Sequence, residues 1–150
     1  MPDRSPRLAV RAVIVEDGRL LLVNAYPGAR SDLWCCPGGG VERHAGLQEN
    51  LIREVWEETG LGIAVGRLLA VSEFHAPERD FHQVELFYRC TITGGTTDGD
   101  WRDPEGVVNR WRWVDERAYA GLRVKPDILR RLAFDPEGPV LHDPLEPIVP

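Results

Sequence analysis

At 150 residues, with 43% hydrophobic and 28% charged residues, the chain has the size and composition of one globular domain, which we take to span residues 1–150. Its net charge of −6 argues against a surface that grips long nucleic acid, because such a surface carries a basic patch. The chain opens without a basic-then-apolar signal peptide, and no apolar run approaches the roughly 20 residues of a membrane span. We therefore expect a cytoplasmic protein that does not contact a membrane.

After a short polar arm at residues 1–7, runs of β-branched and other apolar residues predict strands separated by turn residues. The predicted strands are Leu8–Val15, Leu20–Asn24, Leu33–Cys36, Ile63–Phe74, Val84–Ile92 and, as the final one, Trp111–Val114. Asp17 and Gly18 form the hairpin turn between the first two. Gly66 leaves open whether its segment is one strand or two with a bend.

The rest of the chain is expected to be helical or irregular. Asp115 should cap a short helix over residues 116–121, and Pro126 should open a helix that runs to about Ala133. The polar stretch 94–106 is the longest loop, and such loops are usually functional or disordered. The tail at residues 135–150 has five prolines and no periodicity, so we expect it to wrap the surface or stay loose. Periodicity alone then indicates a mixed sheet of the α/β or α+β class.

The three cysteines, Cys35, Cys36 and Cys90, are odd in number and lack the spacing of zinc ligands. Cys35 and Cys36 are adjacent in a predicted strand and should point to opposite faces. We interpret all three as reduced, packed residues, with a catalytic thiol at this pair as the alternative.

Residues 37–61 hold a Gly-rich turn and then a helix whose polar face carries Glu54, Glu57 and Glu58. Their spacing of i, i+3 and i+4 stacks the carboxylates on one face, where each like-charged pair repels by about 0.2–0.5 kcal/mol. Glu57 and Glu58 also lie in the last turn, where the helix dipole disfavours anions, before Gly60 ends the helix. Such a cluster suits a hard cation, Mg²⁺ or Mn²⁺; a solvated acidic face is the alternative.

The other face of this helix carries the stripe of a core-facing helix. Its members are Leu47, Leu51, Val55 and Thr59, with Ile52 beside them. Gly46 is the expected N-cap, and Glu49 supports the first turn. Arg53 precedes Glu57 by one helical turn and is expected to orient that carboxylate through a charge-assisted hydrogen bond.

These residues resemble the Nudix box, G-x5-E-x7-R-E-U-x-E-E-x-G-U, in which U is a bulky aliphatic residue. Gly39 takes the first position, and the register then places Arg53, Glu54, Val55, Glu57, Glu58, Gly60 and Leu61. The lead-in at residues 33–34 and 37–42 resembles the usual one as well. One position departs from the pattern, because Ala45 stands where the first glutamate of the box is expected.

The resemblance implies an α/β/α sandwich, in which the box forms a loop–helix–loop against a mixed sheet. It also implies a pyrophosphohydrolase that uses Mg²⁺, with Mn²⁺ as an alternative. The reaction is hydrolysis of a phosphoanhydride bond in a nucleoside diphosphate linked to another group. The implied metal ligands are Glu54, Glu57 and Glu58, with Glu54 sharing in proton transfer and Arg53 as the orienting residue.

Residues beside the helix complete the predicted site. Gly39 and Gly40 are the expected cofactor-binding positions, where glycine lets the backbone approach the substrate, although a plain turn is the alternative. Family members often use a further carboxylate outside the box. Glu105 is our candidate for it, with Asp103 and Asp100 as rivals.

Because Ala45 stands at the first glutamate position of the box, the sequence leaves open whether the protein is catalytically active. Glu42 or Glu49 could replace the absent carboxylate, or His44 could serve as a substitute ligand. The activity could also be weak, or the protein could be a nucleotide-binding or regulatory module without turnover. A structural domain that only binds a cation is a third alternative.

The substrate and the oligomeric state stay open. We expect a small nucleotide rather than extended nucleic acid as the partner. Aromatic and arginine side chains in predicted loops could hold a base or phosphates, and none is singled out: Tyr26, Phe74, Phe81, Trp101, Arg30, Arg79 and Arg102. A homodimer through the N-terminal hairpin or the Pro-rich tail is left undecided.

Overall fold

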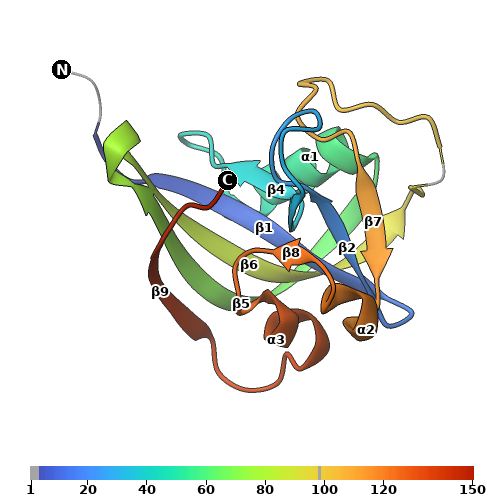
Figure 1. Ribbon diagram of the computed structural model, residues 1–150. Coiled ribbons are helices and arrows are strands. Elements are labelled where there is room, and N and C mark those ends of the chain that lie inside the picture. The colour runs from blue at the N-terminus through green and yellow to red at the C-terminus, as the bar shows by residue number, and fades with distance from the viewer. Residues whose placement is uncertain (1–3, 98) are drawn as a thin grey trace.

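The computed structural model describes residues 4–97 and 99–150 (Figure 1). Its strands are β1 (Arg7–Glu16), β2 (Arg19–Asn24), β3 (Leu33–Cys35), β4 (Gly38–Gly40), β5 (Gly62–Ala76), β6 (Phe81–Gly94), β7 (Trp111–Val114), β8 (Arg123–Val124) and β9 (Leu141–Pro147). Its helices are α1 (Leu47–Thr59), α2 (Glu116–Tyr119) and α3 (Leu129–Phe134), with a 3₁₀ turn, η1 (Pro77–Arg79). No helix among these residues is long and apolar enough to cross a membrane.

The strands of the described residues form one mixed sheet in the order β8-β3-β2-β1-β6-β5-β9. Strand β4 also pairs with β1, and β7 with β2. The pairs β1–β6, β3–β8 and β5–β9 are parallel, and the other pairs are antiparallel. Strand β1 therefore lies at the centre, with β6 along one edge and β4 and β2 sharing the other.

Helices cover both faces of this sheet, as Figure 1 shows. Successive side chains of β1 point to opposite faces. Val13 belongs to a core with Leu129 of α3, whereas Ile14 belongs to a second core with Leu51 and Val55 of α1. The expected α/β/α sandwich is therefore confirmed.

Several local predictions agree with the structure. Asp17 and Gly18 both have positive φ, at 51° and 74°, as a two-residue hairpin turn requires. The Asp115 side chain accepts a hydrogen bond from the Ala118 backbone and so caps α2. Residues 62–76 form one strand, β5, whose pairing with β6 shifts register around Gly66.

Other predictions are wrong. The glycines expected to form a turn form strand β4, because β1 supplies pairing partners, with Gly40 opposite Ala9 and Gly38 opposite Arg11. The strand at residues 111–114 is not the final one, since β8 and β9 follow it. Helix α3 starts at Leu129 rather than at Pro126.

The tail lies along the surface, which is one of the two predicted alternatives, but it is more regular than its lack of periodicity indicated, because part of it is the edge strand β9. This strand runs parallel to β5, and its two prolines are compatible with an edge. Pro144 falls in the irregularity between the pairs Ser72–Asp143 and Phe74–Glu146, where its missing N–H interrupts no regular ladder. Proline content alone was therefore a poor guide to this segment.

Candidate functional site

Strand β4 can lie close to its neighbours only because it consists of glycine. A Cβ atom on Gly38 would lie 2.0 Å from the Val10 carbonyl oxygen, and Gly38 has a φ of 150°. A Cβ on Gly39 would lie 2.6 Å from the carboxyl group of Glu54, and one on Gly40 would lie 2.4 Å from the guanidinium of Arg7. The absence of side chains at Gly39 and Gly40 thus brings the backbone of β4 against an acid and a base, whereas their predicted approach to a substrate stays a prediction.

Helix α1 is held against the sheet by its apolar face. Leu51 and Val55 are fully buried, and the buried Thr59 hydroxyl donates to the Val55 carbonyl at 2.7 Å. Gly60 ends the helix with a φ of 74°, and its N–H donates to the Trp56 carbonyl. Because both the packing and the end of the helix are fixed, the glutamates on its other face have defined positions.

Glu58 points from α1 into the sheet. Its carboxylate accepts a hydrogen bond of 3.0 Å from the backbone N–H of Gly38. Burial raises the pKa of Glu58 to about 8, although the nearby Arg11 guanidinium lowers it. Without a cation, burial therefore favours the neutral, protonated form of this carboxyl group near neutral pH.

Glu54 lies one turn earlier, against Gly39, and its side chain is 15% exposed. Burial is the main cause that raises the pKa of Glu54, and the neighbouring acids Glu57 and Glu105 raise it further. Arg53 opposes this effect from 3.4 Å. Raised pKa values at neighbouring carboxyl groups are typical of functional sites.

Arg53 makes the hydrogen bond that its spacing predicts, to Glu57 at 3.0 Å. The same guanidinium lies 3.4 Å from the carboxylate of Glu42 and 3.2 Å from the side-chain oxygen of Asn50. Of the two candidates to replace the carboxylate absent at Ala45, Glu42 thus contacts Arg53, whereas Glu49 has no ion pair among the described residues. This arrangement draws Glu57 toward Arg53.

A cavity of about 260 Å³, here named the carboxylate cavity, lies between β4, α1 and the loop before β7. It is lined by four acidic residues, Glu54, Glu58, Asp103 and Glu105, and by Arg7, Arg11, Asn24, Cys35 and the three glycines of β4, among others. The structure thus brings Glu105 to Glu54 and Glu58, as predicted. Glu57 and Arg53 lie outside this lining, and Asp100 lines a different hollow beside Trp101.

Two side chains hold the loop of Glu105 in place: Asn24, which the sequence analysis did not single out, and Asp103, which it named only as a rival of Glu105. The buried Asn24 side chain donates to Val107 and accepts from the backbone N–H groups of Asn109 and Arg110. Asp103 accepts from the N–H groups of Glu105 and Val108. The sequence signal for this role was the position of Asn24, a polar residue at the end of a buried strand.

The acidic side chains suit a hard divalent cation by their chemistry, since oxygen ligands and negative charge are what Mg²⁺ prefers. They are not gathered tightly enough to form a finished site: among residues 4–97 and 99–150, no three Asp, Glu, His or Cys side chains could share one metal ion. The physical reason is that Glu57 is bonded to Arg53 and Glu58 to Gly38. The ligand set of Glu54, Glu57 and Glu58 therefore stays a prediction.

Two indole rings support the end of α1 that carries Glu57 and Glu58. Trp101 donates its N–H to the Glu57 carbonyl at 2.9 Å, and Trp111 donates to the Glu58 carbonyl at 3.0 Å. The last turn of α1 has no basic residue, so these N–H groups are the donors that satisfy its terminal carbonyls. Trp101 is therefore a structural residue that also ties the long loop to the helix.

Trp101→Phe is expected to lower the free energy of unfolding by about 1 kcal/mol, because the Glu57 carbonyl loses its donor. For the Mg²⁺-dependent activity proposed below, it should also raise the Mg²⁺ concentration needed for half-maximal activity, since both Glu57 and the loop of Glu105 lose a support. Trp113→Phe is the matched control, as its indole donates to Thr97 rather than to the helix. Urea denaturation and a Mg²⁺ titration measure the two effects; equal Mg²⁺ curves for both variants would contradict the expectation.

Asn50 is the second buried amide that the sequence analysis missed. It is 2% exposed, accepts from the Glu42 N–H and donates to the Gly40 carbonyl, both at 3.0 Å. Asn50→Leu should lower the free energy of unfolding by roughly 1–3 kcal/mol, because the Glu42 N–H and the Gly40 carbonyl both lose their hydrogen-bond partner. Gln48→Leu, at an exposed position of the same helix, is the control. Similar denaturation midpoints for the two variants would show that Asn50 does not anchor β4.

Comparisons with known proteins agree with this geometry. The family model described as "NUDIX domain" matches residues 5–132. A MutT-like protein of Streptomyces ambofaciens is 34% identical over 111 residues, which are 69% of this chain and 68% of that protein. An ADP-ribose pyrophosphatase of Methanocaldococcus jannaschii is 33% identical over 92 residues, 60% of this chain and 53% of that protein.

A solved NUDIX hydrolase from Nitrosomonas europaea has the same fold, with a TM-score of 0.71 at 19% identity and 85% of each chain covered. The chain spans only part of some relatives, such as 44% of one from Bacillus subtilis that is 32% identical. The matched family model nevertheless covers most of the chain, including β4, α1 and the loop of Glu105. On this ground, the chain belongs to the NUDIX domain family.

Proposed function

We propose that the protein is a Mg²⁺-dependent pyrophosphohydrolase that cleaves the phosphoanhydride bond of a nucleoside diphosphate linked to another group. The observation that carries the proposal is the convergence of Glu54, Glu58 and Glu105 on one cavity that also holds Arg7 and Arg11. The names of relatives, an ADP-ribose pyrophosphatase among them, support this class of substrate.

The residues of the cavity have complementary roles. Arg7 and Arg11 provide positive charge for phosphate oxygens, and the glycines of β4 allow close approach of the substrate. Glu105 lies at the exposed side of the cavity and is the candidate to accept a proton from the attacking water. Glu54, Glu57 and Glu58 are the candidates to hold Mg²⁺, which, when bound, lowers the pKa of water and neutralises phosphate charge.

The test is the release of nucleotide with Mg²⁺ from a panel of diphosphate-linked nucleosides. Turnover is expected on at least one member, and Glu57→Gln should lower it by at least about a hundredfold, because charge stabilisation at the phosphates is lost. Glu49→Gln, at an exposed position of the same helix, is the matched control and should keep full activity. Equal rates for the wild type and Glu57→Gln would contradict the assignment of this helix.

A nucleotide-binding module without turnover is the second candidate. Ala45 favours it, because a methyl group supplies neither charge nor a metal ligand at a position where the family has glutamate. Mg²⁺-dependent binding of the panel without product would support this alternative. Ala45→Glu should then restore turnover if the absent carboxylate is the cause.

A further inference from the structure

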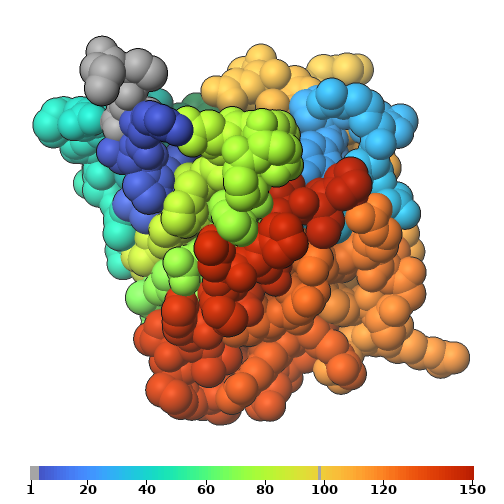
Figure 2. Space-filling model, turned by 60° about the vertical axis from the view of Figure 1, so that its left-hand side comes forward, coloured from blue at the N-terminus to red at the C-terminus, as the bar shows by residue number. Residues whose placement is uncertain are grey.

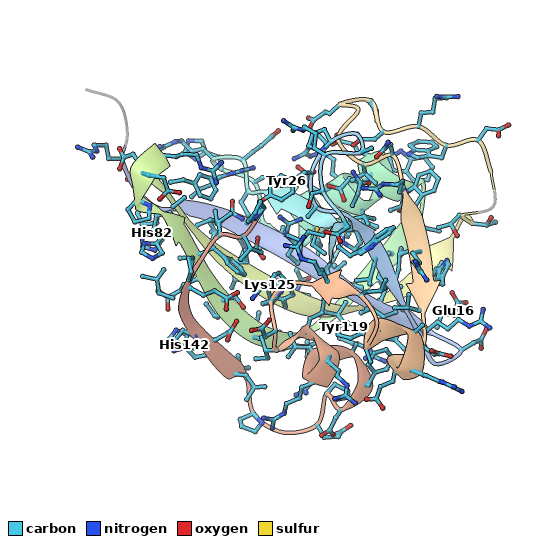
Figure 3. The ribbon with its side chains drawn as sticks, viewed as in Figure 1. Glu16, Tyr26, His82, Tyr119, Lys125 and His142 are labelled. Carbon is cyan, nitrogen blue, oxygen red and sulfur yellow. The ribbon has the colours of Figure 1, made fainter. Side chains whose placement is uncertain are left out.

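A second cavity, of about 280 Å³, opens beside the carboxylate cavity, and we name it the side cavity. Both are lined by Arg7, Arg11, Ala25 and Cys35. A ligand whose phosphates lie against the two arginines can therefore extend from one cavity into the other. Figure 3 shows Tyr26 and Lys125, which line the side cavity, on the side of the sheet where the tail runs.

The lining of the side cavity suits a planar heteroaromatic ring. Three aromatic residues from different segments line it, namely Tyr26, Phe74 and Phe81. Buried polar groups on β6 accompany them: Gln83 donates to Glu85 at 2.7 Å, and Glu85 accepts from Arg11 at 3.2 Å. Apolar and aromatic walls with a few placed polar groups are typical of sites for bases and similar rings.

One wall of the side cavity comes from the tail. Pro147, Ile148 and Val149 line it, at the end of β9 and directly after it. Two hydrogen bonds fix this segment over the cavity: the Ile148 N–H donates to the His75 carbonyl at 3.0 Å, and the Tyr26 hydroxyl donates to the Val149 carbonyl at 2.7 Å. Figure 2 shows the tail as a continuous band across this face of the molecule.

Further contacts tie the tail to strand β5 and to strand β8 and the residue after it. Ser72 of β5 donates to Asp143 at 3.3 Å, and Lys125, just after β8, lies 3.9 Å from the carboxylate of Glu146. Arg123 of β8 donates to the Pro150 carbonyl at 2.6 Å. All of these tail residues lie beyond residue 132, where the family match ends. The wall is thus a feature of this chain outside the matched domain.

We propose that residues 147–149 form one wall of a nucleobase pocket, and that this tail segment determines which nucleoside diphosphate derivatives the protein binds. The inference rests on the proposed function, because the diphosphate would lie where the two cavities meet, near Arg7 and Arg11. Residue 148 contacts the base in this arrangement and lies away from the carboxylates. Changes there alter recognition of the base and leave the chemistry of the diphosphate intact.

The experiment compares two substrates that differ only in the base: ADP-ribose and the base-free diribosyl diphosphate, each hydrolysed with Mg²⁺. Ile148→Ala is expected to raise KM for ADP-ribose about tenfold with kcat unchanged, because apolar contact with the base is lost. The KM of the base-free compound should not change. Leu145→Ala is the matched control, since Leu145 lies three residues earlier on strand β9, is 45% exposed and does not line the side cavity.

The outcomes separate this inference from the proposed function. If Ile148→Ala changes both substrates equally, or neither, the nucleobase wall is overturned while the hydrolase stands. If the wild type hydrolyses nothing, the proposed function fails, and binding of ADP without a divalent cation decides the inference by calorimetry. A tenfold weaker affinity in Ile148→Ala, with Leu145→Ala unchanged, then supports the wall; unchanged affinity, or no binding by the wild type, overturns it.

Discussion

Gly38→Ala is expected to prevent the chain from folding, or to lower the free energy of unfolding by more than about 4 kcal/mol. The new methyl group would lie 2.0 Å from the Val10 carbonyl oxygen and 2.9 Å from the Arg11 Cα. Both atoms belong to the backbone of the central strand β1, which cannot move aside without disturbing its ladder with β6. The φ of 150° at Gly38 adds backbone strain for any other residue.

Gly94→Ala is the control, because a Cβ atom there meets no atom within 4 Å and Gly94 also lies in a strand. Its free energy of unfolding should stay within about 1 kcal/mol of the wild type. Circular dichroism and urea denaturation measure both variants. A folded Gly38→Ala protein of ordinary stability would show that β4 does not pack against β1 as described.

Glu58→Gln is expected to lower kcat by about 10²–10³, because a neutral amide cannot supply the charge that a cation and the phosphates require. The amide oxygen can still accept from the Gly38 N–H, so strand β4 should keep its place. The loss of activity should therefore come without loss of structure. Nucleotide release under saturating Mg²⁺ measures it, and a rate near that of the wild type would remove Glu58 from the site.

The same variant should change how stability depends on pH in the absence of divalent cations. Burial raises the pKa of Glu58 from 4.5 to about 8 in the folded protein, so the folded state binds more protons than the unfolded state between these values. The free energy of unfolding should then fall as the pH rises from 4.5 to 8. Above pH 8, ionisation of Glu58 should lower it no further. Glu58→Gln should flatten this fall. If the free energy of unfolding of the wild type does not fall over this pH range, the raised pKa of Glu58 is contradicted.

Local sequence signals were sufficient for much of the fold. Gly60 marked the end of α1, Asp17 and Gly18 the first hairpin, and Asp115 the cap of α2. These signals work because a left-handed backbone conformation or an unpaired N–H group demands a particular residue type at one place. The spacing from Arg53 to Glu57 predicted their hydrogen bond for a similar reason, since the helix fixes the distance.

Features that depend on distant segments were not predictable in this way. The glycines of β4 look like a turn until β1 offers them a ladder, and the proline-rich tail looks loose until the edge of β5 receives it. The buried amides of Asn24 and Asn50 bind backbone groups that only the tertiary structure brings near. The role of Glu105 was a hypothesis from the family resemblance, which implies a further carboxylate outside the box, and the structure places Glu105 with Glu54 and Glu58 in the lining of one cavity.

The pairing of β1 with a strand far along the chain affects how the protein folds during its synthesis. Arg11 of the first strand bonds to Glu85 of β6, a partner 74 residues later in the chain, and Ser72 of β5 bonds to Asp143, 71 residues later. Contacts at such separation give a high contact order and slow folding. On the ribosome, α1 emerges before β6 exists, so its apolar face has no finished sheet to cover. The acidic cavity can therefore assemble only when synthesis is well past the helix that carries its glutamates.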